Sequence, residues 1–266
     1  MTQALAIASI AIASGTQKGA LVQLLAGALA CVKLDGHERL AIEAENWSIR
    51  TADRGATLLF QGEESKSILV MLSGWSFSYQ ALADGRRQIL DFALPGALIG
   101  FGAGRINWRG VEAITACAVA SLPLAKFYAL LPRCPGFAVQ IAGRIAESET
   151  RAHAHLTHLG RRNARERVAA LIVELTSRSQ LRRTAGSGSG FDLPLTLAMI
   201  GDALGLSSEH VCRTLARMAG DGVLELKRHS LRVLNAQALA DEAGVCDIPL
   251  PTDWRKAPAQ PQFMAA

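Results

Sequence analysis

The hydrophobic period of this 266-residue chain changes once, close to Pro135. Upstream of it, apolar runs of strand length are separated by turn-forming residues, of which Asp84-Gly85 is the strongest hairpin signal. The runs cover residues 58–60, 68–72, 75–82 and 88–94, and residues 111–124 form either a further strand pair or one long strand. Downstream, apolar residues recur every three or four positions, as they do in helices. We therefore predict an α+β fold, with an antiparallel β sandwich or barrel such as a jelly-roll over residues 46–133, followed by a helical part.

A long helix is predicted directly after the jelly-roll, over residues 134–160. Its apolar and small residues form one narrow stripe. The stripe consists of Phe137, Ile141, Ile145, Ser148, Ala152, His155 and Leu159. Such a stripe favours a coiled-coil seam, so we predict a dimer helix; the alternative is a helix packed on its own domain. Gly160, followed by two arginines and Asn163, predicts a hinge before a second helix over residues 164–177.

Two short helices with a glycine turn between them are predicted further along the chain. Thr196 can cap a helix that ends at Gly205, a residue suited to the left-handed turn that stops helices. Ser207 can cap the next helix, over residues 208–219, whose inner face is Val211, Leu215 and Met218. This arrangement predicts a helix-turn-helix, with the second helix as the recognition helix.

The outward residues of the predicted recognition helix suit contacts with base edges. Glu209 and Arg213 share a face, and Arg can bond a guanine edge while Glu can accept from a cytosine amine. The other interpretation is an ordinary ion pair on a solvated helix. His210 and Cys212 lie beside the pair, so we predict that Glu209, His210, Cys212 and Arg213 read bases.

A β-hairpin is predicted after the recognition helix, over residues 222–234, as the wing of a winged helix-turn-helix. Polar and basic residues of the helix and of this wing are candidates for phosphate contacts. They are Ser207, Ser208, Arg217, Lys227, Arg228 and Arg232. We assign residues 161–245 to the DNA-binding domain, which contains a flexible loop over residues 181–190, and residues 246–266 to a flexible tail.

Composition limits the compartment and the partners. The net charge of +5, with a basic stretch from Arg144 to Arg183, favours a polyanion. Five widely spaced cysteines without a C-x-x-C pair indicate neither disulfides nor zinc, which fits a cytoplasmic protein. The apolar run from Ala4 to Ser14 is too short to span a membrane and lacks a cationic flank, so we predict no membrane partner. Residues 1–45 are predicted to be a partly helical extension.

Residues 50–240 resemble the Crp/Fnr family of bacterial transcription regulators. The resemblance rests on the order of jelly-roll, long helix and winged helix-turn-helix, and on the sequence from Ala203 to Leu215. The family's Glu-x-x-Ser/Gly-Arg pattern is present as Glu209-His210-Val211-Cys212-Arg213, with Cys212 replacing the usual Ser or Gly. The sequence from Leu94 to Phe101 looks like that of the Fnr and FixK branches of the family. The resemblance implies a cyclic-nucleotide-binding-like roll and a homodimer on a palindrome with TTGAT-like half-sites. It also implies RNA polymerase as a partner if the protein activates.

The known ligands of the family fit this sequence poorly. Its cyclic AMP binders use a Gly-Glu turn and an Arg-Ser/Thr pair; here the turn is Gly96-Ala97, and Arg105 and Arg109 precede Ile106 and Gly110. Its iron–sulfur branch needs four cysteines, three of them near the N-terminus, where only Cys31 is found, and Ala120 stands where the fourth is expected. His153, His155 and His158 could bind haem, but surface or seam positions explain them more simply. We therefore predict no cofactor and no metal.

Two further hypotheses remain at this point. Cys212 near the start of a helix, beside Arg213, could be redox-active, whereas the simpler view is a small residue that allows close approach to DNA. The protein could instead be a ligand-binding module that signals through protein contacts. A cupin-type enzyme is disfavoured, because His37 is the only histidine before His153.

Overall fold

The computed structural model describes residues 34–102, 104–180, 193–227 and 230–244. Several sequence predictions concern parts of the chain outside these residues. They are the extension up to residue 33 with Cys31, the flexible loop over 181–190, Arg228, and the tail over 246–266.

The N-terminal part is a roll of two antiparallel four-stranded sheets. One sheet has the order β1 (Ser48–Ala52), β8 (Cys117–Pro123), β3 (Ser67–Ser73) and β6 (Leu98–Ile99). The other has the order β2 (Thr57–Leu59), β7 (Gly110–Ala113), β4 (Ser76–Ala81) and β5 (Arg87–Ala93). The predicted strands are confirmed, and residues 111–124 form two strands, β7 and β8, which belong to different sheets. Asp84-Gly85 lies in the turn between β4 and β5, where Gly85 has a φ of 84°.

Strand β3 is apolar from Ile68 to Leu72, because both of its faces are buried there. Leu69 and Met71 face the interior between the two sheets. Ile68, Val70 and Leu72 instead face the helices α3 (Gly36–Ala44), α4 (Leu124–Leu130) and α5 (Pro135–Arg161). A short 3-10 helix, η1 (Leu131–Arg133), joins α4 to α5.

Helix α3 lies within residues 1–45, which we predict to be a partly helical extension, and it packs against the roll. Ala41 and Ile42 are buried in the same cluster as Phe127 and Phe137. Asp35 and Glu38 form a capping box at the start of α3. The carboxylate of Glu38 also accepts a hydrogen bond of 2.5 Å from the amide of Gly136, in the first turn of α5. A negative group at this helix end is favoured by the helix dipole, so α3 anchors the start of α5.

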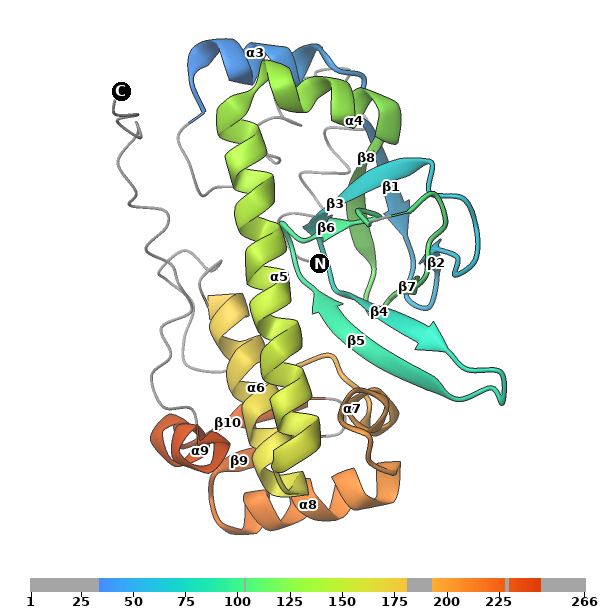
Figure 1. Cartoon of the computed structure of the whole chain (residues 1–266). Helices are drawn as coiled ribbons and strands as arrows, with labels where there is room; N and C mark the ends of the chain where they lie inside the picture. Colours follow the sequence, from blue (N-terminus) through green and yellow to red (C-terminus); the bar gives the residue numbers. More distant parts are fainter. Residues whose placement is uncertain (1–33, 103, 181–192, 228–229, 245–266) are drawn as a thin grey trace, which may run out of the picture.

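Helix α5 runs the length of the molecule, from α3 and α4 at one end to the helix-turn-helix at the other (Figure 1). Gly160 is still helical; the helix ends at Arg161, and Arg162 is extended. Helix α6 (Ala164–Gln180) then begins, and the side chain of Asn163 accepts a hydrogen bond from the Glu166 amide. The predicted break between the two helices is therefore present, two residues later than Gly160.

The C-terminal part contains the predicted helix-turn-helix and hairpin. Its elements are α7 (Leu197–Leu204), α8 (Ser208–Gly220), β9 (Leu224–Lys227), β10 (Ser230–Val233) and α9 (Ala236–Ala243). The sequence analysis does not single out α9, which packs against α6 and buries Leu239 and Ala243.

The roll and the C-terminal part share one hydrophobic cluster. Phe77, Ile89 and Phe92 from β4 and β5 lie in the same cluster as Leu175 of α6 and Leu204 of α7. The two parts therefore form a continuous core within one chain. Within the part of the chain described, no helix is long and apolar enough to cross a membrane.

Candidate nucleic-acid interface

The turn between α7 and α8 is built by the residues that the sequence predicts. The Thr196 side chain accepts from the Met199 amide at 3.2 Å and starts α7, and Gly205 ends it with φ 64° and ψ 37°. The Ser207 side chain accepts from the His210 amide at 3.2 Å and starts α8. Because both ends are capped, the angle between the two helices is fixed by local geometry.

Gly201 allows the close packing of this turn, and sequence analysis missed it. A Cβ atom at Gly201 would lie 2.5 Å from the Leu206 carbonyl oxygen, closer than any side chain can approach. A small residue in the first helix, four positions before the turn glycine, is the signal that could have identified it.

The inner face of α8 anchors the helix in the core. Val211, Leu215 and Met218 are fully buried, as predicted from their spacing. Thr214 is buried as well, and its hydroxyl donates to the His210 carbonyl at 2.8 Å. Since one side of α8 is held along its length, the opposite side points away from the chain.

That opposite side presents the residues predicted to read bases. Glu209, His210, Cys212 and Arg213 are all exposed, as are Ser207, Ser208 and Arg217. Arg213 and Glu209 form an ion pair, and because both are solvent-exposed, it contributes little to stability. Little free energy is therefore lost if the two side chains separate and each bonds a base edge instead.

The predicted wing follows α8 directly. Strands β9 and β10 pair in antiparallel register, with Glu225 opposite Arg232 and Lys227 opposite Ser230. Leu231 is buried against the core and Arg232 is exposed. Lys227 is the last residue of β9, next to the tip of the hairpin.

Several arginines of the basic stretch are instead structural. Arg165 binds Glu242 of α9 and Asp221 at the end of α8, and these hydrogen bonds raise its pKa above the ordinary value. Arg167 donates to the carbonyls of Arg162 and Leu204. The basic count of this stretch therefore overstates the charge available to a polyanion.

The exposed stripe of α5 differs from the predicted one. Phe137 and Ile141 are 0% and 3% exposed, in the core of their own chain, so these two residues are not part of a dimer seam. Ile145 and Ala152 are exposed, whereas Ser148, His155 and Leu159 are half-buried. Exposed residues do follow an alternating three-and-four spacing beyond the first turns. They are Ala142, Ile145, Glu149, Ala152 and Leu156, with Leu156 65% exposed.

The histidines of α5 do not converge. His153 is exposed while His155 and His158 are half-buried. Burial, together with Arg162 and His155, lowers the pKa of His158 to about 4. Among the described residues, no group of three or more His, Cys, Asp or Glu side chains is placed to hold a metal ion.

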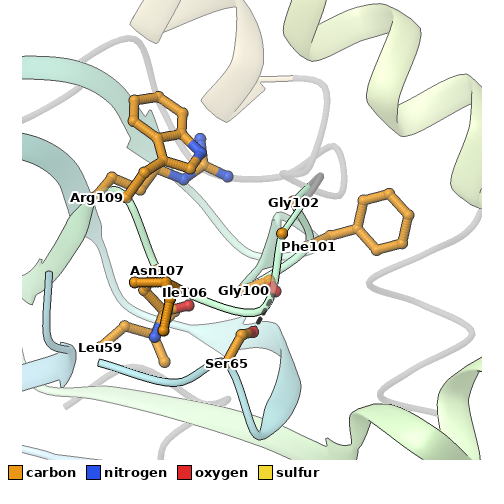
Figure 2. A pocket seen from close by; sticks show the side chains of 10 residues that line it. Leu59, Ser65, Gly100, Phe101, Gly102, Ile106, Asn107 and Arg109 are labelled. Atoms are coloured by element: carbon orange, nitrogen blue, oxygen red, sulfur yellow. Dashed lines mark hydrogen bonds between the residues drawn. The ribbon is translucent and has the colours of Figure 1, made fainter. Parts of the chain in front are cut away.

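A shallow pocket lies in the roll. Its lining includes Leu59, Ser65, Asn107, Trp108 and Arg109, together with Gly100, Phe101, Gly102 and Gly104. Figure 2 shows Ser65 donating to the Gly100 carbonyl, at 3.1 Å, and Phe101 pointing away from Ser65 and Leu59.

The polar groups around this pocket do not fit a cyclic nucleotide. No carboxylate is among its lining residues, and the Arg109 guanidinium stacks against Trp108, 5.4 Å from the ring centre. Burial lowers the pKa of Arg109, although Asp91 partly offsets this. Arg105 is almost fully exposed and pairs with Glu64. A ribose and a cyclic phosphate would therefore lack their partners here.

Comparison with known proteins matches both parts of the chain to domain families. Residues 49–134 match the cyclic nucleotide-binding domain family, and residues 166–242 match the Crp-like helix-turn-helix domain family. The chain is 32% identical over 212 residues to the nitrogen fixation regulation protein FixK of Bradyrhizobium diazoefficiens, covering 77% of this chain and 85% of FixK.

Two further similarities come from a sequence and a solved structure. The fumarate and nitrate reduction regulatory protein of Escherichia coli strain K12 is 32% identical over 195 residues, covering 72% of this chain and 76% of that protein. The structure of FixK2 from Bradyrhizobium japonicum superposes with a TM-score of 0.67 at 27% identity, covering 74% of this chain and 96% of that chain.

Proposed function

Because the chain belongs to the Crp/Fnr family of transcription regulators, we propose that it binds a palindromic promoter site as a homodimer through α8. The relatives are transcriptional regulators rather than enzymes, which removes the cupin-type alternative. The observation that carries the proposal is the outer face of α8, where Glu209 and Arg213 stand exposed on a helix whose other face is buried.

In this proposal Arg213 donates to a guanine edge and Glu209 accepts from a cytosine amine, in a TTGAT-like half-site. His210 and Cys212 lie beside them and contact the remaining bases. Residues at the edges of the helix and on the wing hold the phosphates and set the register. These are Ser207, Ser208, Arg217, Lys227, Arg228 and Arg232.

The dimer forms along α5 in this proposal. An exposed apolar residue on a long helix favours burial against a partner, and Ile145 and Leu156 lie eleven residues apart on one face. Ala142 and Ala152 allow the two helices to approach closely. Two parallel α5 helices would carry the recognition helices to successive major grooves, about 34 Å apart.

We divide the chain for this function into a roll over residues 46–133, preceded by α3, a dimer helix over 134–160 and a DNA-binding domain over 161–245. Regulators of this kind work where the DNA is, which in a bacterium is the cytoplasm. RNA polymerase is the expected partner if the bound site lies where it recruits the enzyme. We assign no cofactor, because the roll pocket lacks the partners of a cyclic nucleotide.

Selection of bound sequences from random duplex DNA, with the full chain, tests the proposal. We expect enrichment of a two-fold symmetric motif, and affinity that falls steeply with salt because phosphate contacts release counterions. An unsymmetric motif would contradict the dimer. Absence of any preferred duplex at moderate salt would contradict the DNA-binding function and leave a protein-contact module.

A further inference from the structure

Strand β5 of the roll contacts three of the four helices that lead to or form the helix-turn-helix. Its residues Ile89 and Phe92 are buried in the cluster that the roll shares with the C-terminal part. Figure 1 shows β5 running toward α5, and β5 also contacts α7. Polar side chains make the remaining contacts: those at the start of β5 bond α7, and those near its end bond α5 and α6.

At the start of β5, Arg87 links the roll to α7. Its Nε atom lies 2.8 Å from a carboxylate oxygen of Asp202, and its Nη1 atom lies 3.4 Å from Glu112 of β7. The guanidinium also stacks over the ring of Phe77, 4.8 Å from its centre. Since two partners on the roll fix its direction, Arg87 presents a rigid cation to Asp202.

The next residue, Gln88, holds the end of α7. Its side-chain amide donates to the Ala203 carbonyl at 2.9 Å, and Arg167 of α6 donates to the Leu204 carbonyl at 3.2 Å. The last carbonyls of a helix lack partners within the helix, so donors from outside determine how its end is seated. The turn of the helix-turn-helix is thus held by β5 from one side and α6 from the other.

Near the end of β5, Asp91 holds the other two helices. It accepts from Arg151 of α5 at 2.8 Å and from Arg178 of α6 at 3.2 Å. Burial alone would raise the pKa of Asp91, but the two guanidinium groups outweigh it and hold the pKa below the ordinary value. Arg178 also donates to the Phe92 carbonyl at 2.5 Å. Because β5 is tied to α5 and α6 here, its Arg87 end has a defined place relative to the long helix.

We infer that Arg87 and Gln88 are positioning residues for DNA binding: they seat α7, and with it α8, at the angle to α5 that spaces the two recognition helices of a dimer. The inference rests on the proposed function. Neither residue contacts DNA, because both lie on the roll side of α7. Their effect is on geometry, so it is felt only when both half-sites must be occupied together.

The test compares a full palindrome with a single half-site, using the full chain. We would measure the affinity of the native protein, Arg87→Gln, Asp202→Asn and the double variant for palindromes whose central spacer varies in single base-pair steps. Arg86→Gln is the matched control, since Arg86 is exposed on the same hairpin and pairs only locally, with Asp84. Thermal unfolding of each variant checks its fold.

We expect Arg87→Gln to weaken binding to the best palindrome about tenfold, as couplings between distant sites commonly do, with half-site affinity unchanged. Its preference among spacers should flatten. The double variant should be no weaker than either single variant, because both substitutions break the same contact between Arg87 and Asp202. Arg86→Gln should bind as the native protein does.

Two results would overturn the inference. One is an unchanged spacer preference in Arg87→Gln. The other is an equal loss on half-site and palindrome, which marks a structural role alone. If the native protein prefers no duplex, the proposed function is refuted instead. This measurement comes first, so the two failures are distinguishable.

Discussion

Helices α8 and α5 bury their inner stripes to different extents. Helix α8 buries Val211, Leu215 and Met218 from its first turns to its last and exposes the opposite side. Helix α5 buries Phe137 and Ile141 in the roll, and beyond them its apolar residues Ile145 and Leu156 are exposed. A hydrophobic period shows which residues share a face, but only the neighbouring elements decide whether that face is covered by the same chain or by another.

The largest test of this contrast replaces one residue from each half of α5. Phe137→Ala should lower the free energy of unfolding by about 3–5 kcal/mol, because it leaves a cavity in the roll core. Leu156→Ala should leave the fold of the chain intact and weaken the dimer instead. Urea denaturation with sedimentation at several concentrations separates the two effects. An unaltered dimer in Leu156→Ala would place the seam elsewhere on the helix.

The exposed face of α8 can be tested with two of its arginines. Arg213→Ala should cost about 1–3 kcal/mol on the preferred site and relax the base preference at one position, because a base contact is lost. Arg217→Ala, one turn further along the same face, should weaken binding on all duplexes to a similar degree. Competition binding over single-base variants of the site measures both. If Arg213→Ala also weakens every duplex equally, Arg213 holds a phosphate.

The half-buried side of α5 predicts a pH dependence of stability. His158 has a pKa of about 4 in the folded chain, against about 6.5 when unfolded, so the unfolded chain binds more protons between these values. Stability contributed by neutral His158 is complete above about pH 6.5 and declines toward about pH 4, by on the order of 1 kcal/mol after allowance for solvent screening.

Urea denaturation at fixed protein concentration across this range measures the decline. His158→Gln should flatten it, and His153→Gln, on the exposed side of the same helix, is the matched control. A decline of equal size in native protein and His158→Gln would assign it to other groups.

The smallest expected effect concerns Cys212. Its thiol is exposed on α8, whereas Cys117 and Cys134 are buried. Hydrogen peroxide would oxidise the thiol to a sulfenic acid with release of water, adding bulk beside the DNA. We expect peroxide to weaken operator binding a few-fold in the native protein and to leave Cys212→Ser unaffected. Equal weakening of both proteins would remove Cys212 from any redox role.

The helix-turn-helix was predictable because its determinants are local. Thr196 and Ser207 cap backbone amides within three residues, and Gly205 ends its helix through its own left-handed dihedral angles. Each of these roles can therefore be recognised from a short stretch of sequence. The interior of α8 follows from its period alone.

The remainder depended on contacts between distant residues. The turn between β7 and β8 lacks Gly and Pro, so the sequence could not distinguish two strands from one long strand. In the structure the Thr115 hydroxyl in this turn accepts a hydrogen bond from the amide of Trp75, 40 residues earlier. The burial of Phe137 and Ile141 within their own chain was missed for the same reason, because α3 and the roll cover them. The contact between Arg87 and Asp202 joins residues 115 positions apart and leaves no pattern in the sequence.

The hydrogen bond from the Gly136 amide to Glu38 has a practical consequence for dissecting the molecule. A fragment cut at the first strand of the roll would discard the carboxylate that closes the N-terminus of α5, along with the apolar cover from Ala41 and Ile42. Such a fragment would expose unpaired backbone amides and an apolar surface, and would be prone to aggregate. Any shortened version meant to keep its native packing should begin no later than Asp35.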